Sequence, residues 1–397
     1  MLPMDFSIVN LGCKVNRVES DDVAALLIAK GSKPVALADA QLIVINTCTV
    51  TGEAEKKTRK AVRHALRSND SATVVVTGCA VAIDPTAYEE MSPRVRIVPK
   101  GDLMKAVSAA GSPDSLRLGG SFPTRVGIKV QDGCNNACTY CIVHVARGKA
   151  WSRPSSEVIE EALAYGAAGV KEMVLTGINL GSYRESGSDG CANLAGLLRR
   201  LLAVVPDARF RISSVEPRDI DDDLIELLAS SEGRVCRHLH LPLQSGSSKV
   251  LREMARPYDA SRYAELVDRI RSKVPSIAIS TDIIVGFPGE TEEDFRQTLE
   301  MVRQCRFAKV HVFRYSKREN TPAAMRDDQV APEIKARRAK ELELVAAQVR
   351  SAERAARAGM RESVLVETDG VATTESYYAV EAPSGASPGM LVECILD

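Results

Sequence analysis

The sequence has no excess of charge of either sign. Lys plus Arg and Asp plus Glu number 52 each among the 397 residues, so the overall charge gives no electrostatic footprint for a polyanion such as nucleic acid. A balanced total leaves room for a local basic surface. We therefore expect any nucleic-acid site in this chain to be a patch and not a general property of the molecule.

Long apolar runs are also missing. No stretch approaches the roughly 18 consecutive apolar residues that a membrane span requires, and residues 1–5 show no cationic segment followed by the apolar core of a secretory leader. These absences predict a cytoplasmic protein without membrane association. In that compartment the ten cysteines are better explained by metal or redox chemistry than by disulfides.

The chain is longer than one ordinary domain, and its patterns predict an α/β protein in four parts. An open parallel α/β domain is expected first, followed by a partial barrel of six strand-helix units, a basic linker helix and a short C-terminal β-module. The expected bounds are 1–120, 121–345, 346–361 and 362–397.

Three cysteines, Cys134, Cys138 and Cys141, lie in one loop after a strand expected at 126–130. Thiolates are soft ligands that hold iron–sulfur clusters, and three of them leave one iron of a four-iron cluster without a protein ligand. An iron of that kind can bind a substrate or cofactor. The alternative is a structural zinc site in which His144 would be the fourth ligand.

Three further cysteines lie far apart in the N-terminal part. Each follows a short β-branched run that reads as a buried parallel strand, at 6–11, 42–45 or 73–77. Because the carboxyl ends of parallel strands share one edge of a sheet, the three thiols are expected to meet there and to hold a second cluster. Each cysteine alone is better explained as a small buried apolar residue, and it is their shared position that favours a cluster. The cysteines are Cys13, Cys48 and Cys79.

The central part predicts six βα units, which suit an incomplete barrel with its chemistry at the carboxyl ends of the strands. The expected strands are 126–130, 172–176, 210–213, 238–243, 277–285 and 309–315. Amphipathic helices are expected at 155–168, 194–204, 221–228, 262–274 and 292–305.

A long helix is expected at 332–358, and residues 331–361 carry eight Lys or Arg against four Glu. Such a surface is either a solvated helix face or an RNA-facing one. The tail from 362 to 397, with strands expected at 364–367, 377–381 and 390–395, has seven acidic residues and no Lys or Arg. Since acidic groups repel phosphate, RNA contact is expected on the helix instead. The candidate cations there are Arg337, Arg338, Lys340, Arg350, Arg354 and Arg357.

The cysteine loop, Cys-x3-Cys-x-aromatic-Cys with Tyr140 as the aromatic residue, resembles the signature of radical S-adenosylmethionine (SAM) enzymes. The resemblance implies that Cys134, Cys138 and Cys141 hold a [4Fe–4S] cluster whose open iron chelates SAM. Reductive cleavage would then give a 5′-deoxyadenosyl radical. In such enzymes the cofactor supplies the radical chemistry, while the protein positions it and excludes solvent.

The motifs as a series, up to about residue 345, resemble the radical SAM methylthiotransferases. The N-terminal motifs Leu-Gly-Cys13, Asn-Thr-Cys48 and Thr-Gly-Cys79 imply an auxiliary [4Fe–4S] cluster that delivers sulfur. The segments 131–136, 175–181 and 236–246 are most similar to the MtaB branch. That branch makes the 2-methylthio derivative of N6-threonylcarbamoyladenosine at position 37 of tRNA, whereas sister branches act on isopentenyladenosine 37 or on a ribosomal protein.

The resemblance also implies cofactor contacts and partners. Two SAM molecules would be used, one to methylate sulfur and one to make the radical. The partners would be the tRNA anticodon loop, an electron donor such as flavodoxin or ferredoxin, and a sulfur source. The implied SAM contacts are Tyr140, Gly177, Asn179, Glu216, Gln244 and Gly286.

The chain departs from the family at two places. After Cys141 the family usually has a proline and then an aromatic residue, whereas this chain has His144 and Val145. If residues 138–144 formed a helical turn, His144 would share a face with the cysteines and could approach the open iron. The tail occupies the position of the family's RNA-binding TRAM module but is short and acidic.

A protein of another class would fit the cysteines as well: an iron–sulfur protein that binds RNA or senses redox state without cleaving SAM. An assay for 5′-deoxyadenosine after reduction separates the two classes. The four cysteines outside both sets are expected to be structural. They are Cys191, Cys236, Cys305 and Cys394.

Overall fold

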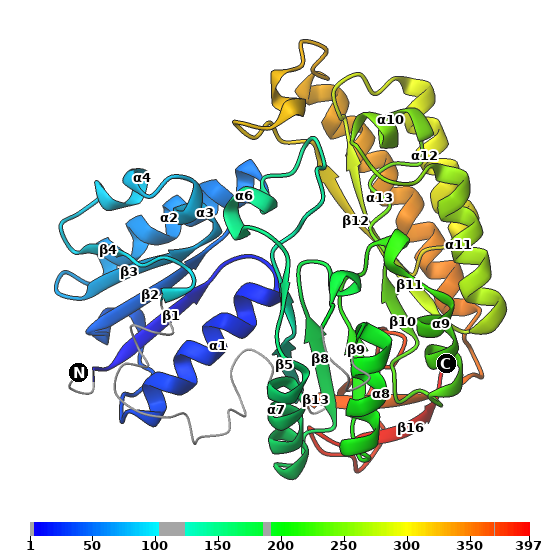
Figure 1. The fold of residues 1–397 in the computed structure, drawn as a ribbon, viewed down its shortest axis with the longest axis horizontal. Coiled ribbons are helices and arrows are strands. Elements are labelled where there is room, and N and C mark those ends of the chain that lie inside the picture. The colour runs from blue at the N-terminus through cyan, green and yellow to red at the C-terminus, as the bar shows by residue number, and fades with distance from the viewer. Residues whose placement is uncertain (1–3, 103–123, 186–191, 369) are drawn as a thin grey trace. The chain divides into compact units, whose positions relative to one another are not determined.

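The computed structural model (Figure 1) describes residues 4–102, 124–185, 192–368 and 370–397. These residues form two compact units. The first contains the N-terminal residues together with 133–136 and 141–150 of the cysteine loop, and the second contains the barrel, residues 137–140 and the C-terminal strands. The boundary expected at residue 120 and the expected structural Cys191 lie outside the described residues.

The N-terminal unit is built on a four-stranded parallel sheet in the order β1-β2-β3-β4. Every residue of β2 is buried, which is the pattern of a parallel strand covered on both faces. The predicted open parallel sheet is therefore confirmed. Its strands are β1 (Phe6–Asn10), β2 (Leu42–Thr47), β3 (Thr73–Gly78) and β4 (Val95–Ile97), and its longer helices are α1 (Lys14–Ala29) and α2 (Gly52–Ser68).

The second unit contains the predicted six parallel strands, in two three-stranded sheets ordered β5-β8-β9 and β10-β11-β12. A parallel bridge between Ser214 and His240 connects the two sheets. The strands are β5 (Val126–Lys129), β8 (Glu172–Thr176), β9 (Arg209–Ile212), β10 (His238–His240), β11 (Ala278–Val285) and β12 (Lys309–Arg314).

Helices follow the barrel strands as the periodicity predicts, and a side-chain cap fixes the start of several. Thr291 and Asp294 form a reciprocal capping box at the start of α12. Figure 1 shows α11 and α12 along one side of β10–β12. The helices are α7 (Ser155–Ala167), α8 (Leu194–Val204), α9 (Asp222–Ser230), α10 (Ser248–Glu253), α11 (Ala260–Lys273) and α12 (Glu292–Cys305). The short elements are η1 (Leu37–Asp39), α4 (Thr86–Glu89), β6 (Gln131–Asp132), β7 (Trp151–Ser152), η2 (Leu180–Ser182), η3 (Pro217–Asp219) and η4 (Pro322–Met325).

The long helix α13 (Pro332–Ala355) packs on β12 and α12. It is continuous across the domain boundary expected at residue 345, so the basic linker helix expected at 346–361 is the second half of a longer helix. In the part of the chain that the structure describes, no helix is both long and apolar enough to cross a bilayer.

Two of the cations expected to face RNA are used inside the fold instead. Arg338 is 3% exposed and its Nη1 lies 2.7 Å from the carboxylate of Glu290. Arg357 is also buried, with its Nη1 2.6 Å from the carboxylate of Glu362. The expectation that these two arginines contact phosphate is therefore wrong. Arg338 lies on the buried face of α13 and Arg357 lies just beyond the end of that helix, and both are held in ion pairs that the charge count does not reveal.

The C-terminal β-module is a four-stranded antiparallel sheet in the order β15-β14-β13-β16. The sequence predicts three strands here and misses β14, which is only four residues long. The strands are β13 (Arg361–Thr368), β14 (Val371–Thr374), β15 (Ala379–Glu381) and β16 (Leu391–Ile395).

A buried charge network joins this module to the barrel. Glu172, Arg209 and Arg211 are 0%, 2% and 0% exposed. Glu172 accepts from the Nε groups of Arg209 and Arg211 at 2.7 and 2.9 Å. The same arginines donate to backbone carbonyls of the module, at 2.8 Å to Ser363 and 2.8 Å to Glu375. The two arginines therefore satisfy one carboxylate of the barrel and the carbonyls of a second sheet.

The acidic residues of the tail have partners of the same kind. Glu375 pairs with Arg237, and Glu367 pairs with Arg125 at the start of the barrel. These two carboxylates pair with arginines of the barrel, so they serve the docking of the module. From the composition alone, the acidic residues of the tail are expected to form a surface that repels RNA.

Removing the carboxylate at the centre of the network should destabilise the protein strongly. Burial raises the pKa of Glu172, but the charges of Arg211 and Arg209 outweigh it and hold that pKa well below its usual range. Glu172→Gln leaves the arginines buried without a counter-charge, which typically costs about 3–5 kcal/mol. Chemical denaturation at neutral pH measures the loss.

The pH dependence provides a second check on Glu172. Because its pKa is lowered on folding, its stabilisation is present above the unfolded value of about 4.3 and disappears as the pH falls through the folded value. The difference between the parent and Glu172→Gln should therefore shrink in acid. Glu293→Gln, which alters a surface pair, should match the parent at every pH. Equal stability of the parent and the Glu172 variant would contradict the network's role.

Candidate functional site

The three N-terminal cysteines meet at the carboxyl edge of the sheet. Cys13 caps helix α1, Cys48 follows β2, and Cys79 is the first residue of helix α3 (Cys79–Ile83). Burial raises the pKa of the Cys48 thiol, and the neighbouring thiols of Cys13 and Cys79 raise it further. The three thiols therefore lie within electrostatic reach of one another, although helices and not loops begin at two of them.

Glycine allows the close approach of the backbone around this cluster of thiols. Gly12 has a φ of +105°, and a Cβ added there would lie 2.8 Å from the Cβ of Cys48. Asn16 fixes the same corner by donating from Nδ2 to the carbonyls of Leu11 and Thr47, both at 2.8 Å. This set of converging thiols on a fixed backbone fits an iron–sulfur cluster with three protein ligands.

Arg147, on helix α6 (Val143–Arg147), faces the first of these cysteines. Its Nη2 donates to Asn16 Oδ1 at 2.5 Å and lies 3.9 Å from Cys13 Sγ. Arg147 lies directly after the cysteine loop, but no pattern in the sequence indicates its role. His144 is exposed on the same helix. The helix starts only at Val143, so the helical turn over 138–144 that would direct His144 toward iron is absent.

Backbone N–H groups surround the sulfurs of the cysteine loop. Asn136 N–H donates to Cys134 Sγ and Val143 N–H donates to Cys141 Sγ, both at 3.4 Å. Such donors stabilise a thiolate over a thiol and adjust the potential of a cluster bound to it. The loop therefore fits cluster ligation by Cys134 and Cys141.

The third cysteine of the loop, Cys138, is buried in the barrel unit. Arg256 Nη1 lies 3.2 Å from Cys138 Sγ, and Nη2 of the same guanidinium donates to Tyr258 Oη at 2.7 Å and pairs with Glu216. Burial raises the pKa of Glu216, and the charge of Arg256 opposes that rise. Arg256 thus joins a cysteine to a predicted SAM contact. Sequence reasoning missed it because no local pattern relates it to the cysteine loop.

The ends of β8 and β9 are tied together by Asn179. Its Oδ1 accepts from the N–H of Glu216 at 3.1 Å, and its Nδ2 donates to Asp219 Oδ2 at 2.6 Å. Gln131 Oε1 accepts from Asn179 N–H at 2.9 Å and would lie 2.9 Å from a Cβ at Gly177. The predicted contacts at this edge therefore lie together, with Asn179 holding the position of Glu216.

The next two strands end in unusual backbone. Gln244 has a φ of +73°, which is uncommon for a residue with a side chain. Its N–H donates to the carbonyl of Asp282 at 2.8 Å and its carbonyl accepts from Ile284 at 2.9 Å. Gly286, at the end of β11, has a φ of +71° and donates to Glu290 Oε2 at 2.6 Å. Tyr140 packs against the apolar group around Phe287.

Two arginine variants should shift the potential of different clusters. Arg256→Met removes a positive charge beside Cys138, and Arg147→Met removes one near Cys13. A reduced cluster is more negative than an oxidised one, so loss of the arginine charge should lower the reduction potential of the adjacent cluster. If the lost interaction is worth about 1 kcal/mol, the shift is on the order of 50 mV. Electron paramagnetic resonance during a redox titration measures both clusters. Each variant is the control for the other, and a shift of the same cluster in both would contradict the assignment.

Two family models match the chain. "Radical SAM superfamily" covers residues 128–302 and "Uncharacterized protein family UPF0004" covers residues 5–99. Among solved structures, the radical SAM methyltransferase TsrM from Kitasatospora setae gives a TM-score of 0.56 at 16% identity, over 82% of this chain and 77% of that one. The likeness to the solved structure concerns the fold.

Curated relatives cover most of the chain. Proteins named threonylcarbamoyladenosine tRNA methylthiotransferase MtaB are 38% identical in Thermotoga maritima, over 83% of this chain and 78% of the relative, and 37% identical in Chlamydia pneumoniae, over 94% and 90%. A protein of Carboxydothermus hydrogenoformans named tRNA-2-methylthio-N(6)-dimethylallyladenosine synthase is 36% identical over 86% of this chain and 83% of its own length.

Proposed function

Because the chain belongs to the family of radical SAM tRNA methylthiotransferases, we propose that it adds a methylthio group to C2 of N6-threonylcarbamoyladenosine at position 37 of tRNA. It is a radical SAM enzyme whose cofactors are SAM and [4Fe–4S] clusters. When bound, these groups supply the radical and the sulfur. The chain supplies the ligands, the positions and the exclusion of water.

The observation that carries the proposal is the presence of two separate sets of three thiols. A radical SAM enzyme that only cleaves SAM needs one set, in the loop of Cys134, Cys138 and Cys141. The second set, at the edge of the N-terminal sheet, gives the sulfur chemistry its own site. We assign Cys13, Cys48 and Cys79 to that auxiliary cluster.

The residues at the carboxyl ends of the barrel strands are proposed to bind SAM. Glu216 offers a carboxylate whose position Asn179 and Arg256 hold, and Gln244 and Gly286 offer backbone groups on the neighbouring strands. Gly177 allows Gln131 and Leu180 to pack closely at the end of β8, and Tyr140 carries an aromatic ring beside the cluster loop. Groups held in this way need little rearrangement when a ligand binds.

The threonylcarbamoyl substrate is supported by the names of the relatives in T. maritima and C. pneumoniae. The relative named as a tRNA-2-methylthio-N(6)-dimethylallyladenosine synthase is nearly as similar, so the side chain on adenosine N6 is the point that needs a test. The partners in this proposal are the tRNA anticodon loop, an electron donor such as flavodoxin or ferredoxin, and a sulfur source. A cytoplasmic location follows from the tRNA substrate.

The test is made with the purified, cluster-loaded enzyme, SAM, a reductant and two tRNAs. One carries threonylcarbamoyladenosine at position 37 and the other carries isopentenyladenosine. Mass spectrometry of the nucleosides should find the methylthio product in the first tRNA and at least about tenfold less in the second. A preference for the second tRNA would replace the proposed substrate, and 5′-deoxyadenosine without either product would point to another acceptor.

A further inference from the structure

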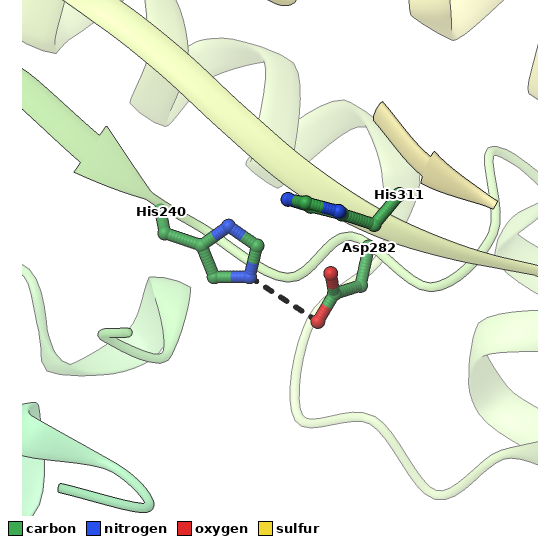
Figure 2. A group of neighbouring side chains, drawn as sticks. All are labelled: His240, Asp282 and His311. Carbon is green, nitrogen blue, oxygen red and sulfur yellow. Dashed lines mark ion pairs between the residues drawn. The ribbon is translucent and has the colours of Figure 1, made fainter. Parts of the chain in front are cut away.

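Three side chains that the proposed function does not use converge inside the barrel unit. His240, Asp282 and His311 come from β10, β11 and β12, and Figure 2 shows them pointing toward one another. One ligand atom of each lies within 4.8 Å of the other two. Among the described residues, no other group of three His, Cys, Asp or Glu side chains has its ligand atoms within 4.8 Å of one another.

The group lies on the face of the sheet that points away from the helices. Along β11 the neighbours of Asp282 on the opposite face, such as Ile283, are buried in the core formed with the helices. Successive side chains of a strand point to opposite faces, so Asp282 faces away from the helices. His240 and Asp282 keep 16% and 28% of their side chains exposed. Small solutes can therefore reach the group.

The hydrogen bonds around His240 leave a place for a cation. Its Nδ1 lies 3.0 Å from Ser280 Oγ, and its Nε2 lies 3.2 Å from Asp282 Oδ2. Ser280 has one hydroxyl hydrogen, and Oγ also lies 3.0 Å from His238 Nε2 and 3.4 Å from the carbonyl of Leu239. When that hydrogen goes to either of these neighbours, His240 Nδ1 is the donor. In that tautomer the lone pair on Nε2 faces a carboxylate, and a metal ion or an added proton between them removes the repulsion. In the other tautomer Nε2–H donates to Asp282 directly.

The third ligand favours a metal ion over a proton. A proton is shared by two atoms, whereas His311, paired in register with Asp282, brings a second imidazole to the same point. The rings of His240 and His311 lie 5.7 Å apart, edge toward face. A histidine that binds metal commonly has its other nitrogen held by a hydrogen bond that fixes the ring and its tautomer. Ser280 is placed to do this for His240.

We propose that His240, Asp282 and His311 form a binding site for one divalent first-row transition ion, such as zinc or ferrous iron. Two imidazoles and a carboxylate are the donors that such ions prefer, while thiolates select softer metals. Three protein ligands leave a coordination position open for water or for an oxygen of a bound molecule. The site uses none of the cysteines of either thiol set, and its residues on β10 and β11 precede Gln244 and Gly286 along the chain.

The test uses the full-length, cluster-loaded protein under anaerobic conditions with zinc as the probe. Zinc bound per chain is measured after desalting, and X-ray absorption at the zinc edge identifies its ligands. We expect one zinc per chain with nitrogen and oxygen at about 2.0–2.1 Å and no sulfur at about 2.3 Å. Binding to a vacant cysteine would give the longer distance.

Variants separate this site from adventitious binding. His311→Ala and the isosteric Asp282→Asn should each weaken zinc binding at least about tenfold, whereas His64→Ala, which removes a histidine from helix α2, should leave it unchanged. The absorption of the iron–sulfur clusters reports that each variant is folded. Three results would overturn the proposal: no stoichiometric zinc, zinc with sulfur ligands, or a zinc affinity of the Asp282 and His311 variants equal to that of the parent protein. A proton shared between His240 and Asp282 would then remain.

Discussion

A variant in which Cys134, Cys138 and Cys141 are all replaced by alanine should keep about half of the parent's iron and cleave no SAM. The three thiols occupy one loop, and the other set lies on a different sheet, so loss of the first set leaves the second intact. Iron and sulfide analysis after anaerobic reconstitution measures the first effect. Formation of 5′-deoxyadenosine with a reductant measures the second.

A matched control is available among the remaining cysteines. Cys394 lies in β16 of the C-terminal module, outside both sets, so Cys394→Ala should keep all the iron and the full rate of SAM cleavage. Zinc in place of iron at the Cys134 loop of the parent protein would contradict the cluster assignment. So would SAM cleavage that survives in the triple variant.

Replacing Cys48 by alanine should separate SAM cleavage from sulfur transfer. Cys48 is a buried member of the N-terminal set, and its Sγ would lie 2.9 Å from a Cβ added at Gly12. A cluster with one ligand removed should not hold a transferable sulfur. The variant should therefore form 5′-deoxyadenosine near the parent rate and no methylthio nucleoside. Both products are measured from the same reaction by mass spectrometry.

Cys305→Ala is the corresponding control for a buried thiol. Burial raises the pKa of Cys305 to about 12, and its sulfur lies 3.3 Å from Met301 Sδ, so it is a packing residue without access to a metal. This variant should make product at near the parent rate. If Cys48→Ala did the same, Cys48 would be structural and the sulfur would come from another place.

Local patterns predicted the strands and the thiols because both are short-range properties of the chain. A run such as residues 42–45 is apolar throughout and mostly β-branched, and the three cysteines of the loop lie within eight residues. Strands β4 and β14, at three and four residues, are too short for periodicity to stand out. Their place in a sheet depends on a partner strand that the local sequence does not contain.

The arginines of the site could not be predicted for a related reason. Arg256 is 118 residues from Cys138 and Arg147 is 134 residues from Cys13, so each contact is a product of the fold. The charge of the tail is not informative about its contacts for the same reason. Glu375 reaches an arginine 138 residues earlier in the chain, and a count of charges within one segment does not reveal a partner in another.

The contacts of Arg209 and Arg211 with the C-terminal module also affect how the barrel folds during synthesis on the ribosome. Arg211 donates to the carbonyl of Thr374, 163 residues later, and at about 5–20 residues per second that acceptor is made on the order of 10–30 s after the arginine. During this interval the guanidinium groups of Arg209 and Arg211 lack the backbone carbonyls that accept from them in the C-terminal module. Completion of the barrel should therefore wait for the last strands, and ribosome-bound chains that stop before residue 361 should remain sensitive to protease.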